Sequence, residues 1–297
     1  MIINRPNLER LRTGFKTTFQ QQLDQAKPMY PRVSMRVNSS TGKETYGWLG
    51  KIPSVRQWLG DRHVQNLMEH DYVISNLDYE LTIGVDRNHI QDDELGIYTP
   101  IFQQFGDSVA AWPDELVWGL LAAGFTTACY DGQYFFDTDH PRIVDENTTV
   151  SVANTDGGSG TPWFLIDASK AVKPIIWQVR KQGEFVALDN PNDENVFRNK
   201  TFEYGWDGRG NVGFGLWQFA WGSKQTLNKA NYKIAREAMM AFKGDYGRPL
   251  NVKPNLLVVP PSLEGQALEI LNAQRDAAGA TNVYEKTAEL LVVPWLA

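Results

Sequence analysis

The residues most able to do chemistry lie in one short segment that holds three aspartates and a histidine. Asp131, Asp137, Asp139 and His140 offer the oxygen and nitrogen atoms that divalent cations take as ligands. Their spacing matches no zinc or calcium loop, because there is no second histidine at helical spacing and no acidic loop that ends in glutamate. Aspartates before glycine are common in turns. We therefore predict no metal here, and a metal-dependent hydrolase built on these four residues is the alternative from another functional class.

Two further features resemble functional sites, but a structural role explains each of them more simply. The run from Gly208 to Gly213 fits the dinucleotide pattern G-x-G-x-x-G, but both flanks predict strand, whereas the fingerprint needs a helix after it. Cys129 could act as a nucleophile with His140 as its base, yet a single thiol directly after an apolar helix is more often buried and inert. We predict that the chain is not an enzyme and has no catalytic residue, no cofactor-binding residue and no cofactor.

Composition narrows the class of protein. With 297 residues, of which 42% are hydrophobic, the chain can form one large or two ordinary globular domains. A net charge of −6 argues against a protein whose main function is to bind nucleic acid. One cysteine excludes an internal disulfide and fits a reducing compartment. The sequence predicts neither a signal peptide nor a membrane span.

The first elements are a helix and a hairpin. Apolar residues at spacings of three and four predict a helix over residues 7–23, which is either an arm that packs on another subunit or the first helix of its own domain. Strict alternation from Leu77 to Val85, with a partner at residues 72–74, predicts a β-hairpin within residues 61–86. A lone hairpin is only marginally stable, so we expect it to lie on a neighbouring surface.

A long helix and a mixed C-terminal half follow. Residues 92–124 predict a helix with acids in its first turn, a kink at Pro113 and Gly124 as its C′ residue. Short strands are expected between residues 150 and 222. Thr226 should then cap a helix that ends at Gly244, and two strands with a helix between them should close the chain. The predicted class is α+β.

Several long motifs, in the same order, resemble the major head (capsid) subunits of Mu-like phages and prophages. They are residues 45–50 (TYGWLG), 85–93 (VDRNHIQDD), 113–125 (PDELVWGLLAAGF) and 130–141 (YDGQYFFDTDHP). The similarity continues from Trp163 to Trp295 and so covers nearly the whole chain.

The resemblance implies an HK97-like major capsid protein fold with five parts. Residues 1–35 would be an N-terminal arm, residues 36–60 would lead into the peripheral domain, and residues 61–86 would be the extended hairpin called the E-loop. Residues 87–224 would be the peripheral domain, with the spine helix at 92–124, and residues 225–297 the axial α/β domain. The strands within residues 150–222 are compatible with either the peripheral or the axial domain.

The resemblance also implies a function. The chain would be a structural subunit that assembles with itself, as hexamers and pentamers, into an icosahedral phage head around double-stranded DNA, which it would contact weakly and without sequence preference. Further partners would be scaffolding, portal and decoration proteins, with no membrane. The expected location is the virion capsid, assembled in the bacterial cytoplasm. A cellular nanocompartment shell of the same fold, enclosing protein cargo, is the alternative within the fold.

Overall fold

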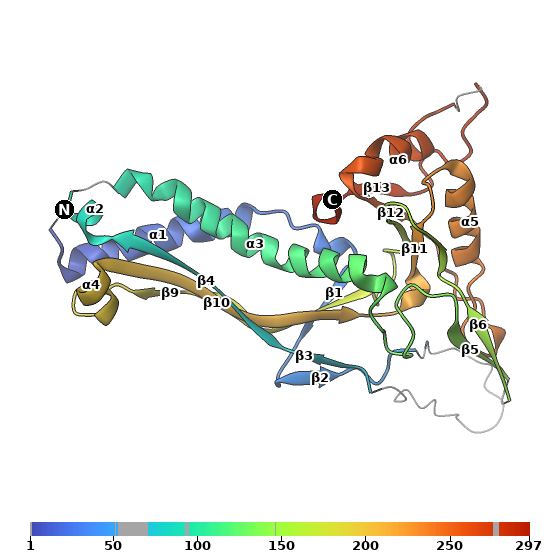
Figure 1. Cartoon of the computed structure of the whole chain (residues 1–297), viewed down its shortest axis with the longest axis horizontal. Helices are drawn as coiled ribbons and strands as arrows, with labels where there is room; N and C mark the ends of the chain where they lie inside the picture. The colour runs from blue at the N-terminus through green and yellow to red at the C-terminus, as the bar shows by residue number, and fades with distance from the viewer. Residues whose placement is uncertain (1, 51, 53–70, 93–94, 146, 276–278) are drawn as a thin grey trace.

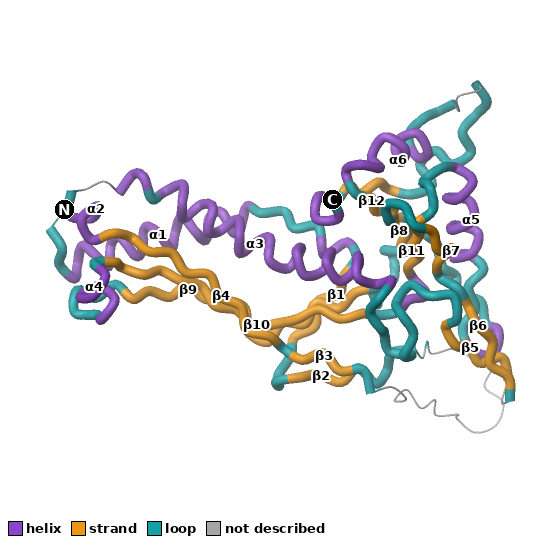
Figure 2. Tube along the Cα trace, viewed as in Figure 1, coloured by secondary structure: helices purple, strands orange, loops and turns teal. Residues whose placement is uncertain are grey.

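The computed structural model describes residues 2–50, 52, 71–92, 95–145, 147–275 and 279–297. The molecule has two parts (Figure 1): a long wing, made of two helices on a four-stranded sheet, and a compact unit at one end of the wing, built around a five-stranded sheet. Figure 2 shows that helix and strand run side by side along the wing.

The wing sheet has the order β1-β9-β10-β4. Strands β9 and β10 form a long antiparallel hairpin, and the short helix α4 (Glu194–Asn199) lies at its tip. Strand β4 pairs antiparallel with β10, and β1 pairs in parallel with the start of β9. The strands span Ser34–Asn38 (β1), Leu77–Asp86 (β4), Ile175–Leu188 (β9) and Thr201–Phe214 (β10).

Helix α1 (Arg5–Gln25) packs on its own chain. The Asn4 side chain caps its first turn by accepting the backbone N–H of Asn7. Its apolar face carries buried Phe15, whose ring stacks on Phe102 of α3 with centroids 4.0 Å apart. Of the two possibilities for the predicted N-terminal helix, the structure shows an ordinary first helix, because α1 buries its apolar face within this subunit.

The predicted spine helix is shorter than expected. Helix α3 spans Thr99–Ala122 and continues through Pro113. Asp92 caps the end of the separate short helix α2 (Arg87–Gln91), so the expected first turn was wrong. Gly124 is not a left-handed C′ residue, because no positive φ occurs there. It lies in a short 3-10 turn, Ala123–Phe125, against the ring of Phe136.

The predicted hairpin was wrong in its pairing. Strand β3 (Val73–Ser75) pairs with β2 (Lys43–Thr45), and β4 pairs with β10 instead of β3. Asn76 does not make a tight turn: its side chain is buried and donates to the Ser39 hydroxyl and the Thr41 carbonyl. Residues 61–70 of the expected E-loop lie outside the described residues.

The compact unit draws its strands from distant parts of the sequence. Its sheet has the order β13-β12-β8-β11-β7. The strands expected within residues 150–222 therefore divide between the two sheets. The elements of the unit are β7 (Thr155–Gly158), β8 (Trp163–Ile166), β11 (Ala220–Lys224), α5 (Lys229–Met240), β12 (Leu256–Val259), α6 (Glu264–Leu271) and β13 (Glu289–Val292).

Helix α5 begins later and ends earlier than the sequence predicted. Asn228, and not Thr226, is its N-cap, because the Asn228 side chain accepts the backbone N–H of Asn231. The helix ends at Met240, before Gly244. A two-stranded ribbon of β5 (His140–Asp145) and β6 (Thr148–Val152) completes the described structure beside the unit.

Candidate functional site

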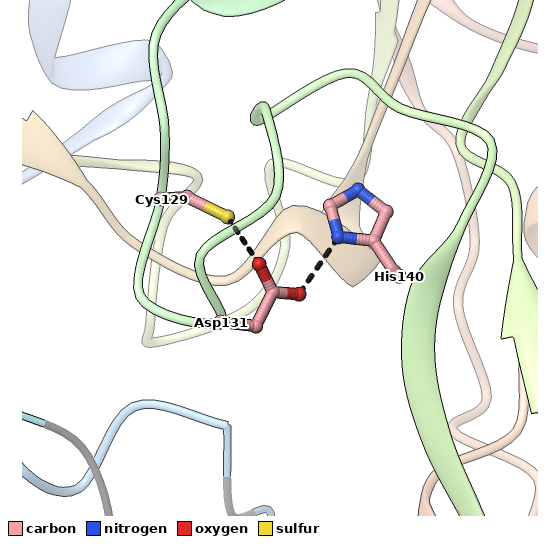
Figure 3. Close-up of side chains that lie close together, drawn as sticks. All are labelled: Cys129, Asp131 and His140. Atoms are coloured by element: carbon pink, nitrogen blue, oxygen red, sulfur yellow. Dashed lines mark hydrogen bonds and ion pairs between the residues drawn. The ribbon is translucent and has the colours of Figure 1, made fainter. Parts of the chain in front are cut away.

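The structure brings together only part of the predicted cluster. Asp131 lies between Cys129 and His140 (Figure 3). The Cys129 thiol donates to Asp131 Oδ1 at 3.1 Å, and Asp131 Oδ2 lies 2.8 Å from His140 Nδ1. One ligand atom from each of these three residues lies within 4.8 Å of the others. The group that could hold a cation is therefore Cys129, Asp131 and His140, with sulfur, oxygen and nitrogen donors.

Asp137 and Asp139 are engaged elsewhere. Asp137 uses its carboxylate within the loop, where it accepts the backbone N–H groups of Tyr134 and Thr138. Its hydrogen bond to Asp139 is the main cause that raises the pKa of the Asp139 carboxyl. The four residues chosen from the sequence thus do not form one site.

Asn154 is the residue that the sequence did not reveal. Its side-chain oxygen lies 3.2 Å from His140 Nε2 and accepts the backbone N–H of Asp137 at 2.9 Å. Its amide nitrogen donates to the carbonyl oxygens of Phe135 and Ala220. Asn154 is fully buried directly before β7, so it joins His140, the preceding loop and β11 through one side chain.

The arrangement suits a structural role better than nucleophilic catalysis. Burial, followed by the charge of Asp131, raises the pKa of the Cys129 thiol far above its usual range. The thiolate is the reactive form of cysteine, so this environment suppresses reactivity. Asp131 also separates the thiol from His140, the base that was considered for it. The polar atoms of the group instead satisfy one another, as buried polar groups must.

Aromatic packing surrounds this polar group. Phe135 stacks on Phe214 of β10 at 4.3 Å, and His140 stacks on Trp217 at 4.1 Å. Two glycines allow a close approach to Phe136: a Cβ on Gly124 would meet its ring at 2.8 Å, and a Cβ on Gly222 would meet it at 2.6 Å. Residues 126–139, which we call the aromatic turn, are therefore held between the end of α3 and the sheet of the unit.

The glycine-rich motif does not make a nucleotide site. Gly208 and Gly210 lie within strand β10, at two register shifts in its pairing with β9, and no helix follows that strand directly. A Cβ on Gly208 would meet the Trp206 ring at 2.5 Å, and one on Gly210 would meet the Gln178 carbonyl oxygen at 2.6 Å. These glycines therefore lie where the β9–β10 pairing is irregular, with strand on both sides as the sequence predicted.

Similarity to known proteins identifies the family. The family model described as "Mu-like prophage major head subunit gpT" matches residues 8–296. The chain is 42% identical to the major capsid protein of Escherichia phage Mu over 289 residues, which are 95% of each chain. Within the described residues, no helix combines the length and apolar character needed to cross a membrane.

Solved structures agree with the sequence comparison. The procapsid chain of bacteriophage JBD30 superposes with a TM-score of 0.90 and 40% identity, covering 99% of this chain and all of that one. The JBD30 capsid chain in shells decorated with minor capsid protein trimers gives 0.77 and 33% identity, with 93% of each chain covered.

These comparisons confirm the expected HK97-like α+β capsid fold, and favour a structural capsid protein over the hydrolase and the nanocompartment shell. The relatives are structural proteins, in agreement with the prediction that the chain is not an enzyme. The chain belongs to the family of Mu-like prophage major head subunits, the capsid proteins of Mu-like phages.

Proposed function

We propose that this subunit assembles as hexamers and pentamers into an icosahedral head that encloses double-stranded DNA, and that assembly takes place in the bacterial cytoplasm. The observation that carries the proposal is the near full-length match to the JBD30 procapsid chain. The wing would be the peripheral domain, and the compact unit with α5 and α6 would be the axial domain. The decorated JBD30 shell supports a decoration protein as a partner of this subunit. Scaffolding and portal proteins are the further partners that we propose.

The tip of the wing supports a contact between subunits. Phe197 in α4 is 85% exposed, and Val186 and Leu188 of the adjacent β9 are about half exposed. Clustered apolar side chains on the surface of a soluble chain mark a place where another protein binds. We therefore assign this tip to a contact between neighbouring capsid subunits.

Helix α1 supports weak contact with packaged DNA. Residues 5–27 carry five basic and two acidic side chains, although the whole chain has a net charge of −6. Arg10 and Lys16 are exposed on this helix, and Arg12 lies 3.6 Å from Asp189. Exposed cations contact phosphates without reading sequence, and such binding weakens as salt rises.

Electron microscopy of the purified chain tests the assembly proposal. We expect rings or closed shells, with six-fold and five-fold capsomers in reconstructions. Phe197→Asp should leave the subunit folded, because this side chain is not part of the core, but should reduce shell formation. Phe197→Leu is the matched control and should assemble. A wild-type chain that stays monomeric under every assembly condition would refute the proposal.

Charge reversal tests the contact with DNA separately. An Arg10→Glu/Lys16→Glu variant should still form shells, but its binding to duplex DNA should be weaker and less salt-dependent than that of the wild type. A variant with Lys233→Glu and Lys243→Glu, in and just after α5 of the compact unit, carries the same change of charge at exposed positions away from α1 and serves as the comparison. Unchanged DNA binding after reversal on α1 would remove this helix from the DNA contact.

A further inference from the structure

His140 has a hydrogen-bond acceptor at each ring nitrogen. The hydrogen bonds of Asn154 fix the orientation of its side-chain amide. Its nitrogen donates to two carbonyl oxygens, and its oxygen accepts the backbone N–H of Asp137. The atom that faces His140 Nε2 at 3.2 Å is therefore an oxygen, and Nε2 must carry a proton.

A second proton lies on the other side of the ring. His140 Nδ1 and Asp131 Oδ2 are 2.8 Å apart, a distance that requires a proton between them. Asp131 Oδ1 accepts two further hydrogen bonds, from the Cys129 thiol and the backbone N–H of Gln133. Those donors favour the ionised carboxylate, and the face of Trp217, stacked 4.1 Å away, favours a cation on the ring. The proton is thus better placed on Nδ1 than on Asp131.

We propose that His140 is a doubly protonated imidazolium in the folded subunit, and that Asp131, His140 and Asn154 form a proton-dependent clamp that fastens the aromatic turn to the sheet of the compact unit. The clamp joins the turn through Asp131, the start of β5 through His140 and the start of β7 through Asn154, and Asn154 ties them to β11, which is distant in sequence. The backbone N–H of Gly222 in β11 also donates to the Asn154 carbonyl, which fixes Asn154 on that strand.

The surroundings determine how the clamp responds to pH. The titratable groups near the clamp are Cys129, Tyr130 and Asp131 of the turn and Asp139 before β5. Behind them lie Asp137, which contacts Asp139, and Asp245, which acts on Tyr130 and accepts the Ile143 N–H. Loss of the Nδ1 proton would set a ring lone pair against the Asp131 carboxylate, so alkaline pH should loosen the turn.

Magic-angle-spinning NMR on sedimented full-length protein labelled with ¹⁵N-histidine tests the protonation state, whether or not the protein has assembled. The chain has four histidines, and His140→Gln identifies the signal of interest. At about pH 7.5 we expect both ring nitrogens of His140 to be protonated, because each faces a hydrogen-bond acceptor. A single protonated nitrogen on His140 at that pH would overturn the proposal.

Hydrogen exchange tests the clamp itself. In His140→Gln, backbone amides of residues 127–136 should exchange at least ten-fold faster than in the wild type, whereas His89→Gln, which removes a histidine bonded to the Tyr98 hydroxyl on the wing, should leave them unchanged. If His140→Gln fails to fold, the same amides are followed in the wild type as pH rises, after correction for intrinsic exchange. Protection that stays constant while His140 loses its proton would refute the clamp.

Discussion

Asp114 of helix α3 holds the backbone of Tyr30, a residue 84 positions earlier in the chain. Its carboxylate accepts the Tyr30 N–H at 2.5 Å and the Met29 N–H at 3.0 Å, and the Trp118 indole donates to it at 3.0 Å. The carboxylate is buried and follows Pro113 directly. The segment that leads from α1 into β1 is therefore fixed on the middle of α3.

Replacing Asp114 should destabilise the subunit strongly. Asp114→Ala leaves buried N–H donors without an acceptor, and we expect a loss of about 2–3 kcal/mol in the free energy of unfolding. Urea unfolding of the unassembled subunit measures it. Asp107→Ala, on the same helix, removes a single part-buried hydrogen bond from the Gln22 side chain and should change stability less. Equal losses in the two variants would contradict the assigned role of Asp114.

Two glycines near the end of α3 should respond in opposite directions to alanine. Gly124→Ala places a methyl group against Phe136 and should cost about 1–3 kcal/mol. Gly119 has open space around it in the helix, so Gly119→Ala should stabilise by about 0.5–1 kcal/mol. Thermal unfolding of both variants, measured side by side, checks the pair. If Gly124→Ala left the melting temperature unchanged, the aromatic turn would have moved to accommodate the added methyl group.

Asp131 should give the subunit an acid-sensitive component of stability. Burial acts to raise its pKa, but the hydrogen bond and charge of His140 outweigh this and hold the pKa below its usual value. The stabilisation is then complete above the unfolded pKa of about 3.9 and is lost as pH falls through the lower folded value. Melting temperatures of wild type and Asp131→Asn should therefore converge between about pH 4 and pH 2.

Asp139→Asn is the control for that experiment. Asp139 is exposed and its pKa is raised, chiefly by its hydrogen bond to Asp137, so its linkage has the opposite sign. This variant should not reproduce the convergence seen with Asp131→Asn. A constant difference between wild type and Asp131→Asn down to the lowest pH would show that Asp131 is not ionised in the folded protein.

The protein should contain no stoichiometric zinc. The Cys129 thiol and His140 Nδ1 hold their protons in hydrogen bonds to Asp131, and a cation would have to displace both. Elemental analysis after dialysis against zinc-containing buffer checks this expectation. One zinc per chain that disappears in His140→Ala would contradict it and make Cys129, Asp131 and His140 a metal site.

Local features of the fold could be predicted, whereas long-range pairing could not. The apolar spacing in α1 and most of α3 follows from neighbours within a few residues, and the structure has both helices. The partner of β4 was missed because alternation from Leu77 to Val85 indicates a half-buried strand without saying what pairs with it. Asn76 has the type of a turn residue, but Ser39 and Gln178 hold it in the interior.

In the candidate site, too, the local contact could be predicted from the sequence and the long-range contact could not. The segment around Asp131 and His140 stood out by residue type, and the contact between these two residues is local. Asn154 lies in a turn-rich stretch where an asparagine is expected to face solvent. Its burial depends on β11, 66 residues further along, and nothing near it in sequence indicates that partner.

The path of the chain interlaces the wing with the compact unit. It leaves the wing after α3, returns between β8 and β9, and crosses again between β10 and β11. No single cut between β8 and β10 separates the two parts, since each sheet contains strands from both sides of such a cut. A protease nick in this region would leave both fragments bound through hydrogen-bonded strands. The nicked subunit would thus keep its fold without the peptide bond there.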